Sequence, residues 1–211
     1  IPYGDPTAVN GKWIPGPNIA LFDAIKKSLG ELPIIAEDLG VITDGVRKLR
    51  DDSGFPGMKV LQFAFDPNEA GKEGMVNAFL PHMYPQASVV YTGTHDNDTM
   101  QGWLDSASDA EVKIAAECAF GKKISETEAR ALSDNGELCA GLIRSAIAST
   151  ADMAVIPMQD ILDLGAEARM NTPNTLGGTN WAWRIAPGSL TKERAENLAF
   201  ISDLYGRNIR K

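Results

Sequence analysis

Short apolar runs that end in polar clusters recur along this chain, with segments of helical spacing between them. The expected strands cover residues 33–36, 58–65, 88–92 and 153–157. Three of these runs lead into acidic or imidazole groups, at Glu37-Asp38, at 94–98 and at Asp160. Apolar strands that alternate with helices are typical of a parallel sheet, whose functional groups gather at the carboxyl ends of the strands. The sequence therefore predicts an α/β fold with four parallel strands side by side in chain order.

Apolar residues at helical spacing, capping residues and glycine stops predict the helices between these strands. The expected helices cover about 19–29, 43–52, 109–152 and 191–205, and a further helix begins near Asp98-Thr99. Four strand-then-helix units are half of a (β/α)8 barrel. The alternative is an open doubly wound sheet, which usually has a glycine-rich turn after its first strand, and no such motif follows any expected strand. We expect half of a TIM barrel, forming one partial domain over residues 1–211.

The charge and the apolar content exclude several classes of partner. The formal net charge is −8, so the phosphates of nucleic acids and anionic membrane surfaces are repelled. No apolar stretch approaches the roughly 20 residues of a membrane span. Cys118 and Cys139 lack the spacing of a metal or redox motif. We expect a reduced, cytoplasmic setting and a neutral or cationic ligand.

Glu37-Asp38 is a candidate general acid. A carboxyl group that leaves a buried strand beside Ile34 and Ile35 can have its pKa raised by desolvation, and this suits proton donation. The alternative is that either acid caps or pairs with a neighbouring loop. Since Glu37 and the cluster at 94–98 both follow strand ends, we expect Glu37, His95 and Asp96 to converge on one cleft.

The cluster at 94–98 joins an imidazole to several carboxylates. These groups can hydrogen-bond sugar hydroxyls, hold a metal ion or cap the helix that begins near Thr99. The chain has only two histidines, which disfavours a His-rich metal site. Trp103 is expected in the core, whereas Trp181 and Trp183 lie in a glycine-rich loop, where flat aromatic faces can contact sugar rings.

Several long stretches resemble one known family. They are PIIAEDLGVIT at 33–43, VVYTGTHDNDT at 89–99, ARMNTP at 168–173 and NWAWR at 180–184, with supporting likeness at 1–17 and 57–65. Together, and in this order, they resemble the 4-alpha-glucanotransferases, also called amylomaltases or disproportionating enzymes. The resemblance implies a (β/α)8 barrel that transfers a segment of an alpha-1,4-glucan to the 4-hydroxyl of glucose or of another glucan. Alpha-1,4-glucans, maltooligosaccharides and glucose are then the partners, and no metal or organic cofactor is implied.

The resemblance also assigns roles to individual residues. Glu37 matches the family's general acid/base. Asp96 matches its third carboxylate, which binds sugar hydroxyls and distorts the ring, and His95 matches the imidazole beside it at the cleavage subsite. Asn171 and Asp66 match positions that contact bound glucan.

One element of the family pattern is absent. The nucleophilic Asp lies in an Arg-x-Asp-His-Phe-Arg-like segment, which does not occur in these 211 residues. We therefore expect the chain to be the C-terminal half of the barrel, with strands five to eight, and to be inactive without the N-terminal half. Two alternatives remain open: a non-catalytic glucan-binding fragment, and a metal-dependent hydrolase. The hydrolase would use as ligands Glu37, Asp38, His95, Asp96 and Asp98.

Overall fold

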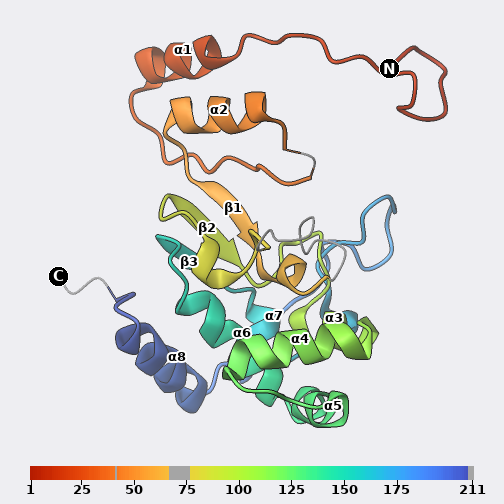
Figure 1. The fold of residues 1–211 in the computed structure, drawn as a ribbon, viewed down its shortest axis with the longest axis vertical. Helices are drawn as coiled ribbons and strands as arrows, with labels where there is room; N and C mark the ends of the chain where they lie inside the picture. Colours follow the sequence, from red (N-terminus) through yellow and green to blue (C-terminus); the bar gives the residue numbers. More distant parts are fainter. Residues whose placement is uncertain (41, 67–76, 209–211) are drawn as a thin grey trace. The chain divides into compact units, whose positions relative to one another are not determined.

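The computed structural model describes residues 1–40, 42–66 and 77–208 of the chain (Figure 1). Contacts between residues divide it into two compact units, Ile1–Pro56 and Gly57–Lys211. Each unit is considered by itself below.

The first unit contains two helices that pack on each other, α1 (Ile19–Leu29) and α2 (Asp44–Ser53). Thr43 caps α2, because its hydroxyl oxygen accepts a hydrogen bond from the N–H of Val46 at 3.4 Å. Both helices are where the sequence predicts them. None of the described residues of this unit is buried. The described part of this unit therefore has no core of its own.

The expected strand at 33–36 is wrong as a sheet strand. In the described part of the chain, this segment makes one backbone hydrogen bond to a neighbouring segment, from the N–H of Ala36 to the carbonyl of Pro56 at 2.9 Å. Pro33 has no N–H to donate, so a regular ladder cannot start there. Ile34 and Ala36 are half-buried and Ile35 is exposed.

The second unit contains a parallel sheet of three strands in the order β1-β2-β3. The strands are β1 (Gly57–Val60), β2 (Ser88–Tyr91) and β3 (Met153–Val155). Their order and direction confirm the prediction for the last three expected strands. The expected strand 58–65 is too long, because residues from Leu61 onward form the 3-10 helix η1 (Leu61–Ala64). This turn is also largely buried, so the apolar run continues past the end of the strand.

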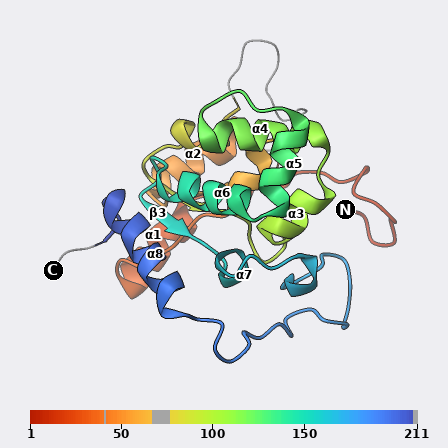
Figure 2. The same ribbon diagram turned by 90° about the horizontal axis from the view of Figure 1, so that it is seen from below.

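Helices cover the sheet, with α4, α5 and α6 packed on one another (Figures 1 and 2). The α-helices are α3 (Met100–Ser106), α4 (Asp109–Phe120), α5 (Glu126–Asp134), α6 (Glu137–Ile147), α7 (Met158–Ile161) and α8 (Lys192–Leu204), and the short 3-10 helices are η2 (Pro81–Met83) and η3 (Ala166–Ala168). The expected helix 109–152 is thus three helices, separated by turns at the left-handed residues Gly121 and Gly136. Within the described ranges no helix is long and apolar enough to cross a membrane.

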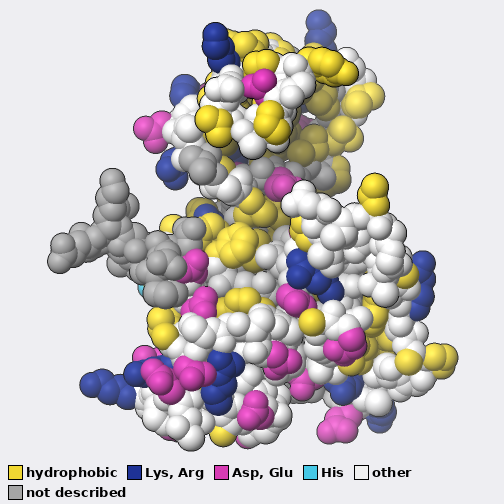
Figure 3. Space-filling view, turned by 90° about the vertical axis from the view of Figure 1, so that its right-hand side faces the viewer, with side chains coloured by type: hydrophobic (Ala, Val, Ile, Leu, Met, Phe, Trp, Pro, Cys, Tyr) yellow, Lys and Arg dark blue, Asp and Glu magenta, His cyan; other side chains and the backbone are white. Residues whose placement is uncertain are grey.

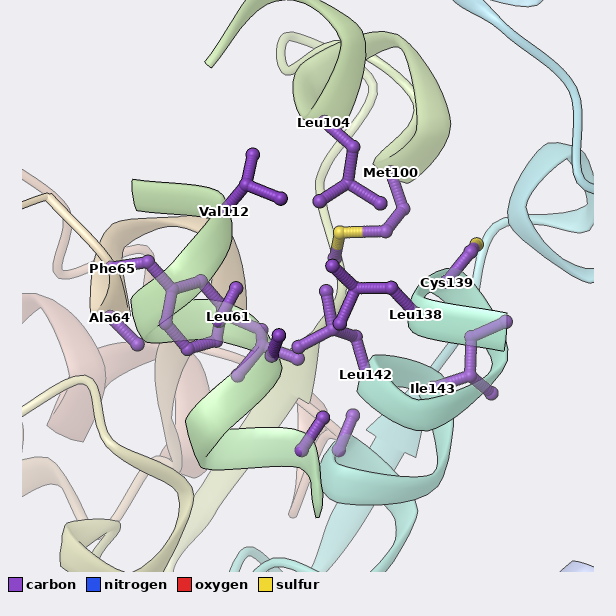
Figure 4. Packing of buried hydrophobic residues seen from close by; sticks show 14 of the residues in the cluster. Leu61, Ala64, Phe65, Met100, Leu104, Val112, Leu138, Cys139, Leu142 and Ile143 are labelled. Carbon is purple, nitrogen blue, oxygen red and sulfur yellow. The ribbon is translucent and has the colours of Figure 1, made fainter. Parts of the chain in front are cut away.

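The core of the second unit lies between the sheet and these helices (Figure 4). Its large side chains, all almost inaccessible to solvent, include Leu61, Phe65, Met100, Leu104, Val112, Leu138 and Leu142. Each such side chain stabilises the fold by roughly 1.5–3 kcal/mol. Trp103 is half-buried and packs on Phe65, with ring centroids 5.7 Å apart, which confirms its expected place at the core. The core thereby fixes the end of β2 and the start of α3, and the segment between them contains the predicted site.

Candidate active site

The turn after β2 presents His95 and Asp96. The side-chain oxygen of Asn97 accepts hydrogen bonds from the N–H and the hydroxyl of Thr94, at 2.9 and 2.8 Å. The N–H of Asn97 in turn donates to the carbonyl of Thr94 at 3.2 Å. These local bonds close a tight turn whose tip exposes about half of each functional side chain, 52% for His95 and 53% for Asp96. Both groups are available to a ligand in solution.

The far end of this segment is tied to α3 and to η1. Thr99 caps α3, because its hydroxyl oxygen accepts the N–H of Gly102 at 3.0 Å, so the predicted helix start near Asp98-Thr99 is confirmed. The buried amide of Gln62 donates to the carbonyl of Asp98 at 2.9 Å. The segment is therefore held at both ends.

Asp160, in the third acidic cluster of the sequence, is buried beneath this segment. One of its carboxylate oxygens accepts the hydroxyl of Thr92 at 2.5 Å, and the other accepts the N–H of Met100 at 2.8 Å. Burial raises the pKa of Asp160, while the hydrogen bonds from Met100 and Thr92 oppose the shift. This carboxylate joins α7 to the end of β2 and the start of α3, and so helps to fix both ends of the segment that contains the site.

A second loop, after η3, brings Asn171 to the turn. The side-chain amide of Asn171 donates to Oδ1 of Asp96 at 2.6 Å, although the two residues are 75 positions apart. The backbone N–H of Asn171 donates to the carbonyl of His95 at 3.1 Å. Nε2 of His95 lies 3.5 Å from the same Oδ1. The structure thus groups three of the predicted residues, His95, Asp96 and Asn171.

Arg169 joins the same two loops. Its Nη2 donates to the carbonyl of Asp96 at 2.7 Å, and its Nε donates to the carbonyl of Asn171 at 2.8 Å. Its Nη1 lies 3.7 Å from the carboxylate of Asp98. No role for Arg169 is predicted from the sequence.

Trp181 lies beside His95 in this group. Its ring centroid is 5.0 Å from that of His95, with 39° between the ring planes, and its backbone N–H donates to the carbonyl of Met170 at 2.7 Å. Trp181 is 57% exposed and has a φ of 61°, which is uncommon for a bulky residue. It lines a cavity of about 210 Å³ together with Thr94, His95, Asn97, Asp98, Thr99, Pro157, Gln159, Arg169 and Met170. This cavity has aromatic, amide and charged walls, which suit a polyhydroxylated ring.

Glu37 and Asp38 lie in the first unit and have different surroundings. The side chain of Asp38 is 5% exposed, although the residue as a whole is half-buried, and it accepts a hydrogen bond from Nη1 of Arg50 at 2.7 Å. The bonds to Asp38 and then to Asp51 raise the pKa of the Arg50 guanidinium. Asp38 is therefore a structural partner of α2, whereas the alternative for this acidic pair expected a cap or a pairing with a neighbouring loop. Glu37 is exposed in the described structure, so its predicted desolvation beside a buried strand is not found there. Its convergence on His95 and Asp96 stays a prediction.

Asp66 is half-buried just after η1, and its expected contact with glucan also stays a prediction. Among the residues that the structure describes, no group of three His, Cys, Asp or Glu side chains is arranged to hold a metal ion. Two of the acids proposed as metal ligands face arginines instead, Asp38 toward Arg50 and Asp98 toward Arg169. The structure gives the metal-dependent hydrolase no support.

Comparison with known proteins gives consistent results. A family model described as 4-alpha-glucanotransferase matches residues 1–191. A 4-alpha-glucanotransferase of Thermus thermophilus is 46% identical, covering 98% of this chain and 39% of the relative. One from Synechocystis is 44% identical, covering 99% of this chain and 38% of the relative. An amylomaltase from Streptococcus agalactiae, solved in complex with acarbose, superposes with a TM-score of 0.78 at 34% identity, covering 94% of this chain and 37% of the solved one. The chain thus spans about two fifths of the length of these relatives.

Proposed function

Because this chain belongs to the 4-alpha-glucanotransferase family, we propose that it is part of an enzyme that transfers segments of alpha-1,4-glucans. The acceptor is the 4-hydroxyl of glucose or of another maltooligosaccharide. The observation that supports this most directly is the grouping of His95, Asp96 and Asn171 at the carboxyl end of β2. This is the end of a parallel sheet at which barrel enzymes place their chemistry.

Asp96 acts on the sugar at the bond that is cleaved. Asn171 and His95 both approach its Oδ1, and within the described ranges no hydrogen bond reaches its Oδ2. The free oxygen is thus available to a sugar hydroxyl, and the negative charge is available to an oxocarbenium-like transition state. His95 and Asn171 present further donors beside it. Substrate hydroxyls would be held by the same groups that orient the carboxylate.

Glu37 is the proposed general acid and base. Retention of the alpha configuration takes two displacements: a carboxylate attacks the anomeric carbon while Glu37 protonates the departing glycosidic oxygen. Glu37 then removes the proton from the 4-hydroxyl of the acceptor, which attacks the glycosyl-enzyme. The attacking carboxylate must lie only about 5 Å from the acid. We assign it to an aspartate outside these 211 residues, in the part of the protein that corresponds to the remaining three fifths of the relatives.

Replacement of the acid tests this function. In the full-length protein, Glu37→Gln should lower maltotriose disproportionation by about 10² to 10⁴-fold, because the amide keeps the shape of the side chain but cannot exchange the proton. Binding of maltooligosaccharide, measured by calorimetry, should change little. Asp38→Asn is the neighbouring control: it should lower the melting temperature through loss of the charged pair with Arg50, with a smaller loss of turnover.

Full turnover by the Glu37→Gln enzyme would show that another group is the acid. If the Glu37→Gln enzyme lost both glucan binding and turnover, Glu37 would instead be a residue that only contacts substrate.

A further inference from the structure

Arg169 connects the two loops of the site through a single guanidinium group. Three nitrogens of one guanidinium reach three different residues: Asp96 and Asn171 through their backbone carbonyls, and Asp98 through its carboxylate. The side chain is 27% exposed and lines the same cavity as His95 and Trp181. A planar, permanently charged fork can bind in this way, whereas a lysine ammonium has no such fixed geometry.

We propose that Arg169 is a positioning residue for the transfer reaction, which holds the Asp96 turn against the Asn171 loop. The inference rests on the proposed function of Asp96. The 2.6 Å hydrogen bond between Asn171 and Asp96 requires the two loops to keep their relative positions. Arg169 holds these positions because it binds the backbone carbonyl of each of the two residues. If the loops separate, the carboxylate loses its orientation although every group remains present.

Arg169 binds the backbone carbonyl of Asp96 and not its carboxylate, and this difference affects the chemistry. Arg169 binds the main chain of Asp96, so it fixes the turn without pairing directly with the Asp96 carboxylate. Its positive charge faces the carboxylate of Asp98 instead. The negative charge of Asp96 is thus kept for the developing cationic transition state.

The test is a double-mutant cycle in the full-length protein between Arg169→Lys and Asp96→Asn. Arg169→Lys alone should lower kcat for maltotriose by roughly 10-fold or more with a smaller change in KM, because a misplaced group weakens the transition state more than ground-state binding. In the Asp96→Asn background, the same change should cost less than about 2-fold, because residues that act as a unit are not additive. A reactive glucosyl fluoride donor keeps the weak activity of the Asp96→Asn enzymes measurable.

Arg130→Lys is the matched control. Arg130 is 28% exposed in the same unit and also binds three residues, Asp109 and the carbonyls of Leu104 and Ala107. It should lower the melting temperature about as much as Arg169→Lys does, yet leave kcat unchanged.

Two results would overturn the inference in an active enzyme. One is a loss of kcat in the Asp96→Asn, Arg169→Lys enzyme that equals the product of the losses in the two single variants. The other is a loss of kcat in Arg169→Lys that Arg130→Lys reproduces. A wild-type enzyme without any transfer activity would overturn the proposed function as well, so the two failures are distinguishable.

Discussion

Two carboxylates near the end of β2 have opposite surroundings. Asp96 is half exposed and holds one oxygen free of hydrogen bonds from the described residues, whereas Asp160 is 2% exposed and accepts a bond on each oxygen. The first environment suits contact with a ligand, and the second suits a structural link. Sequence alone does not separate them, because both acids follow an apolar run.

Asp160 should make stability depend on pH. Its pKa is raised in the folded protein, so the folded state holds the proton more tightly than the unfolded chain does. Its contribution is fully present below the unfolded pKa, which is near the ordinary value of 3.8, and is lost as the pH rises through the folded pKa. Asp160→Asn removes this dependence, and its amide can still accept the N–H of Met100.

The measurement is the melting temperature of wild type and Asp160→Asn at several pH values from about 4 to 8. The stability of the wild type relative to the variant should fall as the pH rises. A difference that stays constant over this range, or that grows in favour of the wild type, would contradict the account of Asp160.

At the level of elements, the segment that contains His95 and Asp96 ends where the short helix α3 begins. Its Gly102 lies so close to Asp98 and η3 that an added Cβ would clash with the Asp98 carboxylate and lie 2.8 Å from the backbone N of Ala166. Glycine is therefore required for the close approach, not for an unusual backbone conformation.

Gly102→Ala should destabilise the protein by about 1–3 kcal/mol, as overpacking does, and should lower transfer activity because Asp98 faces Arg169. Gly45→Ala in α2 is the control, since an added Cβ there meets only the Thr43 hydroxyl at 3.8 Å. That change should be neutral or stabilising by up to about 1 kcal/mol. The melting temperatures of both variants check this, and a neutral Gly102→Ala would refute the packing argument.

The sequence predicts those elements whose signals are local. The caps at Thr43 and Thr99 and the apolar runs of β1, β2 and β3 all mark real elements. Segment 33–36 has the same apolar character, but pairing depends on partners that the sequence does not reveal. The end of β1 was missed because the buried η1 continues the apolar run.

Site prediction has the same limit. His95 and Asp96 were found from their density of functional groups, and Asn171 from the family resemblance. Arg169 was missed, although it stands only two positions before Asn171 in the stretch ARMNTP. That spacing is the signal that could have grouped the two residues.

At the level of the whole molecule, the described part of the first unit contains no buried residue, while the second has an extended core. Large apolar side chains stand exposed in the first unit, such as Trp13 at 99% and Ile14 at 79%, and Figure 3 shows such side chains on the surface. Exposed apolar surface of this kind needs a covering partner. Together with the greater length of the relatives, it supports the proposal that segments of the same protein outside these 211 residues supply both the cover and the nucleophile.

The central claim is a two-step transfer in which this chain supplies the acid and base but not the nucleophile. The direct test is to treat the full-length Glu37→Gln enzyme with alpha-maltosyl fluoride, whose leaving group needs no acid, and to map the labelled peptide by mass spectrometry. Because the second step needs the missing base, a covalent maltosyl-enzyme should accumulate. We predict one maltosyl group on an aspartate outside these 211 residues. A label on Asp38 or Asp96, or turnover that yields the inverted anomer without any covalent adduct, would contradict the account.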